Sequence, residues 1–75
     1  MNAVAYPNPT NGMITLEAQG MNHISVCNIM GQSVMEMDVD ADQMQLNLDA
    51  FGSGMYLIRI NTVNGQAVKR VSVVR

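Results

Sequence analysis

Cysteine, aromatic residues and charge are all scarce in this chain of 75 residues. The single cysteine, Cys27, excludes an internal disulfide, although chains of this length often depend on disulfides or a metal for stability. With one histidine and one cysteine, the chain also cannot supply four such ligands to zinc. Hydrophobic packing must therefore hold it together, and its 48% hydrophobic content indicates that it folds.

Positive charge is also scarce. Four basic and six acidic residues give a net charge of −2, which excludes the basic surface that nucleic acid or an anionic membrane would require. No apolar run approaches the roughly 20 residues of a membrane-spanning helix. The N-terminus lacks the basic and apolar regions of a signal peptide.

The length limits the chain to one domain, residues 1–75, without room for an active-site cleft between domains. We therefore expect no enzyme activity. We also expect that Met1 is an added start residue and that the domain was excised from a longer secreted protein.

Alternation of apolar and polar residues predicts strands. Turn residues such as Gly20 and Gly31 occur at short intervals, and the segments between them have a period of two. We count about seven short strands and no helix, which predicts a small antiparallel, immunoglobulin-like β-sandwich of two sheets. A partly open barrel is the alternative. The expected core consists of Ile14, Leu16, Ile24, Val26, Leu46, Leu48, Tyr56, Ile58 and Val71.

The last two strands carry the strongest hairpin signal of the sequence. Asn64-Gly65 predicts a type I′ turn between residues 55–61 and 66–74, because both residues tolerate positive φ. Val68 falls on the wrong face for the core, and a bulge near Lys69-Arg70 would correct the alternation.

Four segments carry recognisable motifs. Residues 7–12 read P-N-P-T-N-G, residues 28–32 read N-I-M-G-Q, residues 48–56 read L-D-A-F-G-S-G-M-Y, and residues 68–71 read V-K-R-V. In order and spacing they resemble the motifs of type A C-terminal sorting domains of the type IX secretion system, which end many secreted proteins of Bacteroidetes. Two residues depart from the pattern: Phe51 replaces the usual Leu, and Cys27 stands where an aromatic is common. The match rests on Pro7, Asn8, Pro9, Gly12, Asn28, Gly31, Leu48, Gly54 and Tyr56.

The resemblance implies a function. Such a domain directs an upstream cargo protein of the same chain across the outer membrane, so that the cargo reaches the cell surface or is secreted. The implied partners are the outer-membrane secretion machinery and a surface sortase, which cleaves the domain; many relatives then attach the cargo to lipopolysaccharide. Recognition would involve the folded domain and its C-terminal strands, with Lys69, Arg70 and Arg75 as candidate contacts.

Two alternatives remain open at this point. The chain could be a generic immunoglobulin-like adhesion or carbohydrate-associated accessory module of a cell-surface protein. Lys69, Arg70 and Arg75 could be no more than a solvated sheet edge.

Some motif residues have predictable structural roles. Pro7 and Pro9 bias their neighbours toward extended conformations, so we expect residues 7–12 to be stiff and to project toward the cargo. An edge strand closed by proline is the alternative. Gly54 should take a conformation that a side chain would obstruct, and Tyr56 should bury its ring and direct its hydroxyl to a backbone group.

The aspartates suggest calcium only weakly. Asp38, Asp40, Asp42 and Asp49 occupy positions one, three, five and twelve of a calcium-loop spacing. Gln43, however, stands where such a loop needs glycine. The alternation of this segment indicates a strand with solvent-facing charges instead.

Catalytic and copper sites are equally weak. His23 and Cys27 share a strand face, but four residues of strand separate them by about 13 Å, too far for a catalytic dyad. Met30, Met35 and Met37 could offer thioethers to Cu(I). Filling of the core explains the eight methionines better, because only three aromatic residues supply bulk. We therefore predict no catalytic, cofactor-binding or metal-binding residue.

Overall fold

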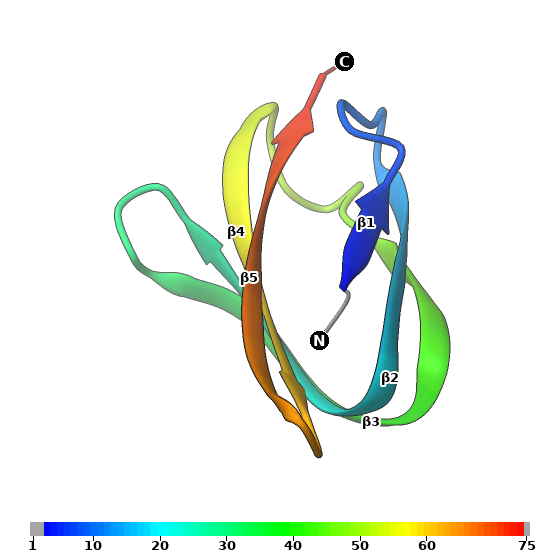
Figure 1. Ribbon diagram of the computed structural model, residues 1–75. Helices are drawn as coiled ribbons and strands as arrows, with labels where there is room; N and C mark the ends of the chain where they lie inside the picture. The colour runs from blue at the N-terminus through cyan, green and yellow to red at the C-terminus, as the bar shows by residue number, and fades with distance from the viewer. Residues whose placement is uncertain (1–2, 75) are drawn as a thin grey trace.

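The computed structural model describes residues 3–74, and their regular secondary structure is entirely β-strand. All pairings between strands are antiparallel, so the predicted all-β, antiparallel class is confirmed. Figure 1 shows the five strands, which are β1 (Val4–Tyr6), β2 (Met13–Asn28), β3 (Ser33–Asn47), β4 (Gly54–Thr62) and β5 (Gly65–Val73).

The long strand β2 is the centre of the sheet because both of its edges are occupied. On one edge it pairs with β3, from Met13↔Asn47 to Cys27↔Ser33. On the other edge β2 pairs first with β1 and then, further along the chain, with β4, which in turn pairs with β5. The strand order is therefore β1-β2-β4-β5, with β3 on the opposite side of β2.

The sheet folds over on itself because β2 and β3 bend together (Figure 1). Their pairing shifts register between Glu17 and Met21 and again between Met21 and His23. Gly20 lies in this bend with a φ of 73°, and its N–H donates to Asp42 Oδ1 at 2.8 Å. Bulges of this kind bend a strand without ending it.

The predicted count of about seven strands in two sheets is therefore wrong: the described residues form five strands in one sheet. The sequence predicted a turn at Gly20, but Gly20 lies inside the continuous strand β2. Gly20 supplies the positive φ of a bulge, not the end of a strand. The acidic part of β3 stays paired through Met21↔Ala41.

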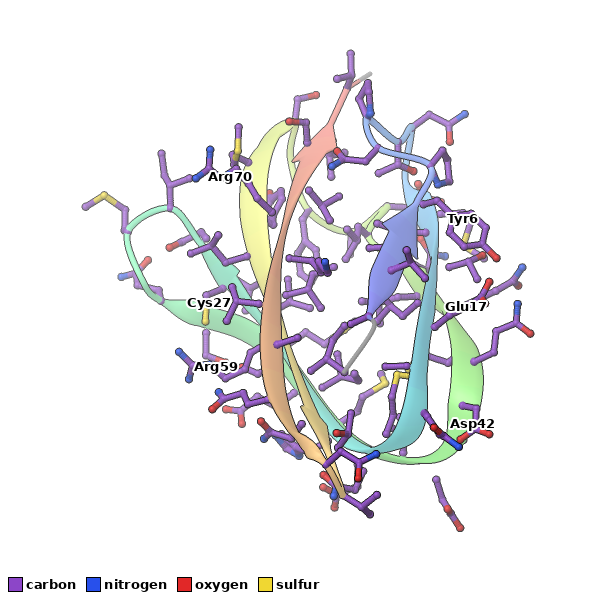
Figure 2. All side chains as sticks on the ribbon, in the orientation of Figure 1. Tyr6, Glu17, Cys27, Asp42, Arg59 and Arg70 are labelled. Carbon is purple, nitrogen blue, oxygen red and sulfur yellow. The ribbon has the colours of Figure 1, made fainter. Side chains whose placement is uncertain are left out.

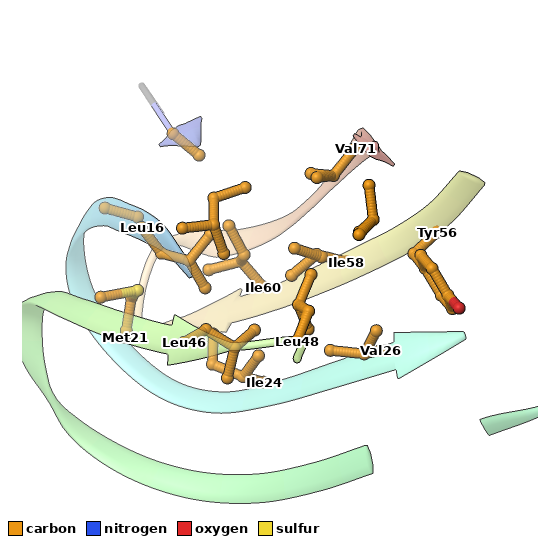
Figure 3. Packing of buried hydrophobic residues seen from close by; sticks show 14 residues of the cluster. Leu16, Met21, Ile24, Val26, Leu46, Leu48, Tyr56, Ile58, Ile60 and Val71 are labelled. Carbon is orange, nitrogen blue, oxygen red and sulfur yellow. The ribbon is translucent and has the colours of Figure 1, made fainter. Parts of the chain in front are cut away.

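The core lies between the two halves of the bent sheet (Figure 3). All nine residues that the sequence assigned to it are buried in one cluster, so this prediction is confirmed. The predicted core omitted five further residues that are buried in the same cluster: Ala3, Ala18, Met21, Ile60 and Val73. Met21 faces inward because the bend shifts the alternation of β2.

The methionines fill the core less than predicted. Among those that the structure describes, only Met21 is fully buried. The others divide into a partly buried group that packs against the core, Met35, Met37 and Met44, and an exposed group, Met13, Met30 and Met55.

The hairpin between β4 and β5 forms as predicted, but its turn lies one residue earlier. Thr62 pairs with Gly65, so Val63 and Asn64 are the loop residues. Within residues 3–74 no residue other than glycine has a positive φ, which rules out a type I′ turn. The Thr62 hydroxyl fixes the turn, since it accepts from the Asn64 N–H at 3.0 Å and donates to the Gly65 carbonyl at 3.1 Å.

The predicted bulge near Lys69-Arg70 is absent from this hairpin. Pairing continues without a register shift from Thr62↔Gly65 to Gly54↔Val73. Val68 simply faces solvent, with 52% of its surface exposed.

Candidate functional site

The P-N-P motif lies along the free edge of β5. The Asn8 side chain replaces a strand backbone there: its Nδ2 donates to the Arg70 carbonyl at 2.9 Å, and its Oδ1 accepts from the Ser72 N–H at 3.0 Å. Thr10 then pairs with β5 through its own backbone, since its N–H donates to the Ser72 carbonyl at 2.9 Å and its carbonyl accepts from Val74 at 2.8 Å. We call residues 7–12 the strap.

The prediction that the strap projects toward the cargo is wrong, because its polar groups satisfy the edge of the last strand. The peptide bonds before Pro7 and Pro9 are both cis. The alternative reading, an edge closed by proline, fits the structure better: among residues 3–74, β1 pairs with β2 alone and ends just before Pro7. Tyr6, the last residue of β1, donates its hydroxyl to the Glu17 carboxylate, and this bond raises the pKa of Tyr6.

Gly12 closes the strap against the loop between β3 and β4. Its φ is 144°, and a Cβ at this position would lie 1.8 Å from Asp49 Oδ1. Its carbonyl accepts from the Leu48 N–H at 2.7 Å, and its N–H donates to Thr10 Oγ1 at 3.1 Å. Glycine suits this conformation, and a larger residue would also require the Asp49 carboxylate to move.

The second motif builds the turn between β2 and β3. Asn28 Oδ1 accepts from the N–H groups of Met30 at 2.9 Å and Gln32 at 3.0 Å, and Asn28 Nδ2 donates to Gln32 Oε1 at 3.0 Å. Gly31 has a φ of 86°, and its N–H donates to the Asn28 carbonyl at 3.0 Å. The Asn and Gly of the motif are therefore turn-forming residues, and the turn holds Ile29 and Met30 in solvent, 72% and 81% exposed.

The third motif shapes the loop that leads into β4. Leu48 is fully buried, and its carbonyl accepts from the Phe51 N–H at 3.0 Å. The Tyr56 ring is buried 5.8 Å from the Phe51 ring, and its hydroxyl donates to the Gly52 carbonyl at 2.7 Å, as the sequence predicted. Gly54 has a φ of 150°, and no atom lies within 4 Å of a Cβ added there, so glycine is required for its conformation and not for space.

The fourth motif does not form one basic surface. Lys69 is opposite Ile58 and shares the inward face of β5 with Val71, where it is half-buried at the border of the core. Arg70 is on the outward face, opposite Leu57. Arg75 lies outside the described residues.

Arg59 is a basic residue of this region that the sequence reasoning missed. It stands on β4, outside the motif, but on the same outward face as Arg70. Its outward direction could have been predicted from the alternation of the strand, because Arg59 lies between the inward-facing Ile58 and Ile60.

His23 forms the best-defined polar cluster of the sheet surface. Its Nδ1 lies 2.8 Å from Asp38 Oδ1 and its Nε2 lies 3.3 Å from Glu36 Oε1. Hydrogen bonds to Asp38 and Glu36 raise the pKa of His23, and the bond to Asp38 makes the larger contribution. Cys27 is a partly buried thiol, and Ser25 separates it from His23 along β2; the Ser25 Oγ is 4.0 Å from the sulfur.

The residues weighed as metal ligands stay apart. Asp38, Asp40 and Asp42 are exposed along β3, whereas Asp49 belongs to the next loop. Met30 is on the exposed turn, while Met35 and Met37 pack toward the core. Within residues 3–74 no three His, Cys, Asp or Glu side chains are placed to hold a metal ion.

The fold places the chain in the class of small antiparallel β domains. Its motif residues have structural roles: they cover the edge of β5, form the turn between β2 and β3, and close the loop before β4. No pocket was found among the described residues for them to surround. In that part of the chain no helix is long and apolar enough to cross a membrane.

The particular family follows from the sequence as a whole. Residues 4–74 match the secretion system C-terminal sorting domain, and the chain belongs to that family, whose members are sorting signals of the type IX secretion system. Proteins that carry such a signal are exported across the outer membrane to the cell surface or are secreted. Among curated proteins, none matches the sequence.

A solved structure shares the fold. It belongs to PorZ of Porphyromonas gingivalis, which is described as an essential bacterial surface component of the type IX secretion system. The two align with a TM-score of 0.76 at 18% identity, over 99% of this chain and 12% of that chain. This chain therefore corresponds in fold to a small part of that larger protein.

Proposed function

We propose that this chain is a non-catalytic address that the type IX machinery reads in its folded form. The strap is the observation that supports this proposal. Asn8 and Thr10 bond to Arg70, Ser72 and Val74, so motif residues from both ends of the domain meet in one hydrogen-bonded structure. These contacts exist only in the folded chain, and an unfolded peptide would present the two motifs separately.

We further propose that the two halves of the single bent sheet act as the two layers of an immunoglobulin-like sandwich. An upstream cargo domain, the outer-membrane machinery and a surface sortase are the proposed partners.

A reporter experiment tests the proposed function. Residues 2–75 are fused behind a signal peptide and a reporter enzyme in a host with type IX machinery, and surface reporter activity is measured. We expect the reporter to reach the surface. Ile58→Asp should abolish export, because a buried unpaired charge costs on the order of 5 kcal/mol, comparable with the whole stability of a small domain.

Val63→Asp is the matched control, since Val63 is 75% exposed and the same substitution should leave folding and export intact. Circular dichroism of both purified domains establishes which variant is folded. Export of an unfolded Ile58→Asp domain at the parental level would show that the folded form is not what the machinery reads.

A further inference from the structure

Charge is segregated along the sequence of this chain. All six acidic residues lie between Glu17 and Asp49, whereas all four basic residues lie between Arg59 and Arg75. Figure 2 shows Arg59 and Arg70 with Cys27 on one flank of the molecule, while Glu17 and Asp42 are on the other. The β4–β5 hairpin is therefore the only part of the chain with an excess of positive charge.

The register of this hairpin arranges its outward side chains as a compact square. Leu57 is directly opposite Arg70, and Arg59 is directly opposite Val68. Directly opposed side chains in an antiparallel pair have Cβ atoms about 5 Å apart. Two guanidinium groups and two apolar side chains thus alternate over four adjacent positions, which we call the arginine patch.

The arginine patch is accessible, and its arginines form no ion pair with another residue between positions 3 and 74. Leu57 is 36% and Val68 52% exposed, and both arginines are exposed. Among residues 3–74, the ion pairs are those that His23 makes with Glu36 and Asp38, so neither arginine of the patch is in one.

The nearest acidic residue by register is already engaged. Glu36 is opposite Ser25 on β2, and Ser25 is opposite Arg59, so one strand separates the two charges. The Glu36 carboxylate accepts from Ser33 and bonds with His23. The positive charge of the patch is therefore left for a partner.

We propose that Leu57, Arg59, Val68 and Arg70 form the surface through which this domain docks on an acidic protein surface with an apolar centre. The inference rests on the proposed sorting function, in which that protein belongs to the secretion machinery. Arginine beside apolar side chains is typical of binding hot spots, because guanidinium forks bind carboxylates while the apolar groups exclude water. A membrane fits less well, since two arginines supply only about 2 kcal/mol of attraction to anionic lipid and the chain carries a net charge of −2.

Lys69 provides an internal control. It is adjacent to Arg70 and carries the same charge, but it is on the inward face of β5, opposite Ile58. A docking surface on the outward face should depend on Arg59 and Arg70 and not on Lys69. A simple requirement for positive charge in the last strand would involve all three.

Photocrosslinking in the fusion protein tests the proposal directly. Benzoylphenylalanine replaces Val68 in the reporter fusion, and the host cells are irradiated. We expect an adduct with one envelope protein, attached to a peptide rich in Asp and Glu by mass spectrometry. Arg59→Gln with Arg70→Gln should reduce both this adduct and surface reporter activity about tenfold or more, while Lys69→Gln leaves both near the parental level.

The outcomes separate the patch from the sorting function. An adduct with lipid, or an adduct equally sensitive to Lys69→Gln, would overturn the docking surface. So would undiminished export and crosslinking in the double arginine variant. The crosslinked adduct tests the docking surface whether or not the reporter is exported. Failure of the parent fusion to reach the cell surface counts against the proposed sorting function instead. Melting curves of the purified domains verify that both glutamine variants remain folded.

Discussion

Two asparagines shape this domain in different ways. Asn28 bonds to residues two and four positions away and completes a local turn. Asn8 bonds to Arg70 and Ser72, 62 and 64 positions away, and ties the start of the domain to its last strand. Each side chain uses both its carbonyl and its amide, but only Asn8 makes a contact that requires the whole fold.

This difference explains why one motif was interpreted correctly and the other was not. An asparagine followed by glycine three residues later predicts a turn from local geometry alone. A P-N-P segment predicts stiffness from the same kind of local argument, but its partner on β5 is invisible in the sequence. The comparison therefore predicts that changes in the strap are transmitted to the C-terminal strand, whereas changes in the turn stay local.

The largest effect is expected from the glycines of the two segments. Gly12→Ala should destabilise the domain by about 2–4 kcal/mol, because a Cβ would collide with Asp49 at a φ of 144°. Gly31→Ala should cost about 1 kcal/mol, because its φ of 86° is unfavourable for alanine but no atom lies within 4 Å of the added Cβ. Urea denaturation of both variants measures the two free energies of unfolding.

The order of these two costs is the critical result. Equal destabilisation would mean that Asp49 moves aside freely and that the strap is no more constrained than the turn. Asp49→Ala combined with Gly12→Ala provides the control, since removal of the carboxylate should restore part of the loss.

Substitution of the asparagines themselves should have a smaller effect. Asn8→Ala should cost about 1–2 kcal/mol, since it removes two hydrogen bonds of about 0.5–1.5 kcal/mol each. Asn28→Ala removes three bonds but should cost less than about 1 kcal/mol, because Asx turns of this kind also form in unfolded chains. Amide hydrogen exchange should accelerate at Ser72 in the first variant and at Met30 and Gln32 in the second.

Asn8→Asp refines this test. The aspartate keeps an acceptor for the Ser72 N–H but loses the donor to the Arg70 carbonyl, so its stability should fall between that of the parent and of Asn8→Ala. If Asn8→Ala leaves exchange at Ser72 unchanged, the strap does not protect β5.

The sequence predicted the interior of this protein better than its connections. Alternation places Ile14, Leu16 and Ile58 inside because one face of a strand must leave water. The same reasoning cannot tell whether Gly20 ends a strand or bends it, since a glycine with positive φ serves both. Strand number was therefore overestimated while the core was correct.

The candidate surface was only partly predictable for a related reason. The motif directed attention to Lys69 and Arg70, but side chains alternate along a strand, and the two residues point to opposite faces. Arg59 belongs to no motif and joins Arg70 only through the pairing of β4 with β5. Predicting this patch requires the register between β4 and β5. The turn predicted at Asn64-Gly65 would have shifted that register and paired different residues.

The smallest expected effect concerns His23, which connects β2 to the acidic strand β3 near the Asn28 turn. Hydrogen bonds to Asp38 and Glu36 raise its pKa above the ordinary 6.5. Because the folded protein binds this proton more tightly than the unfolded chain, the stabilisation is fully present below pH 6.5 and disappears as the pH rises through the folded pKa. The difference in Tm between the parent and His23→Gln should therefore be largest near pH 5.5 and vanish in mildly alkaline buffer.

Asp38→Asn should return the pKa of the His23 imidazole toward 6.5, because it removes the main cause of the shift. NMR titration of the imidazole measures this pKa. An imidazole that titrates at or below 6.5 in the parent would show that these hydrogen bonds do not persist in solution, and the turn would then remain the main local constraint on this end of the β2–β3 pair.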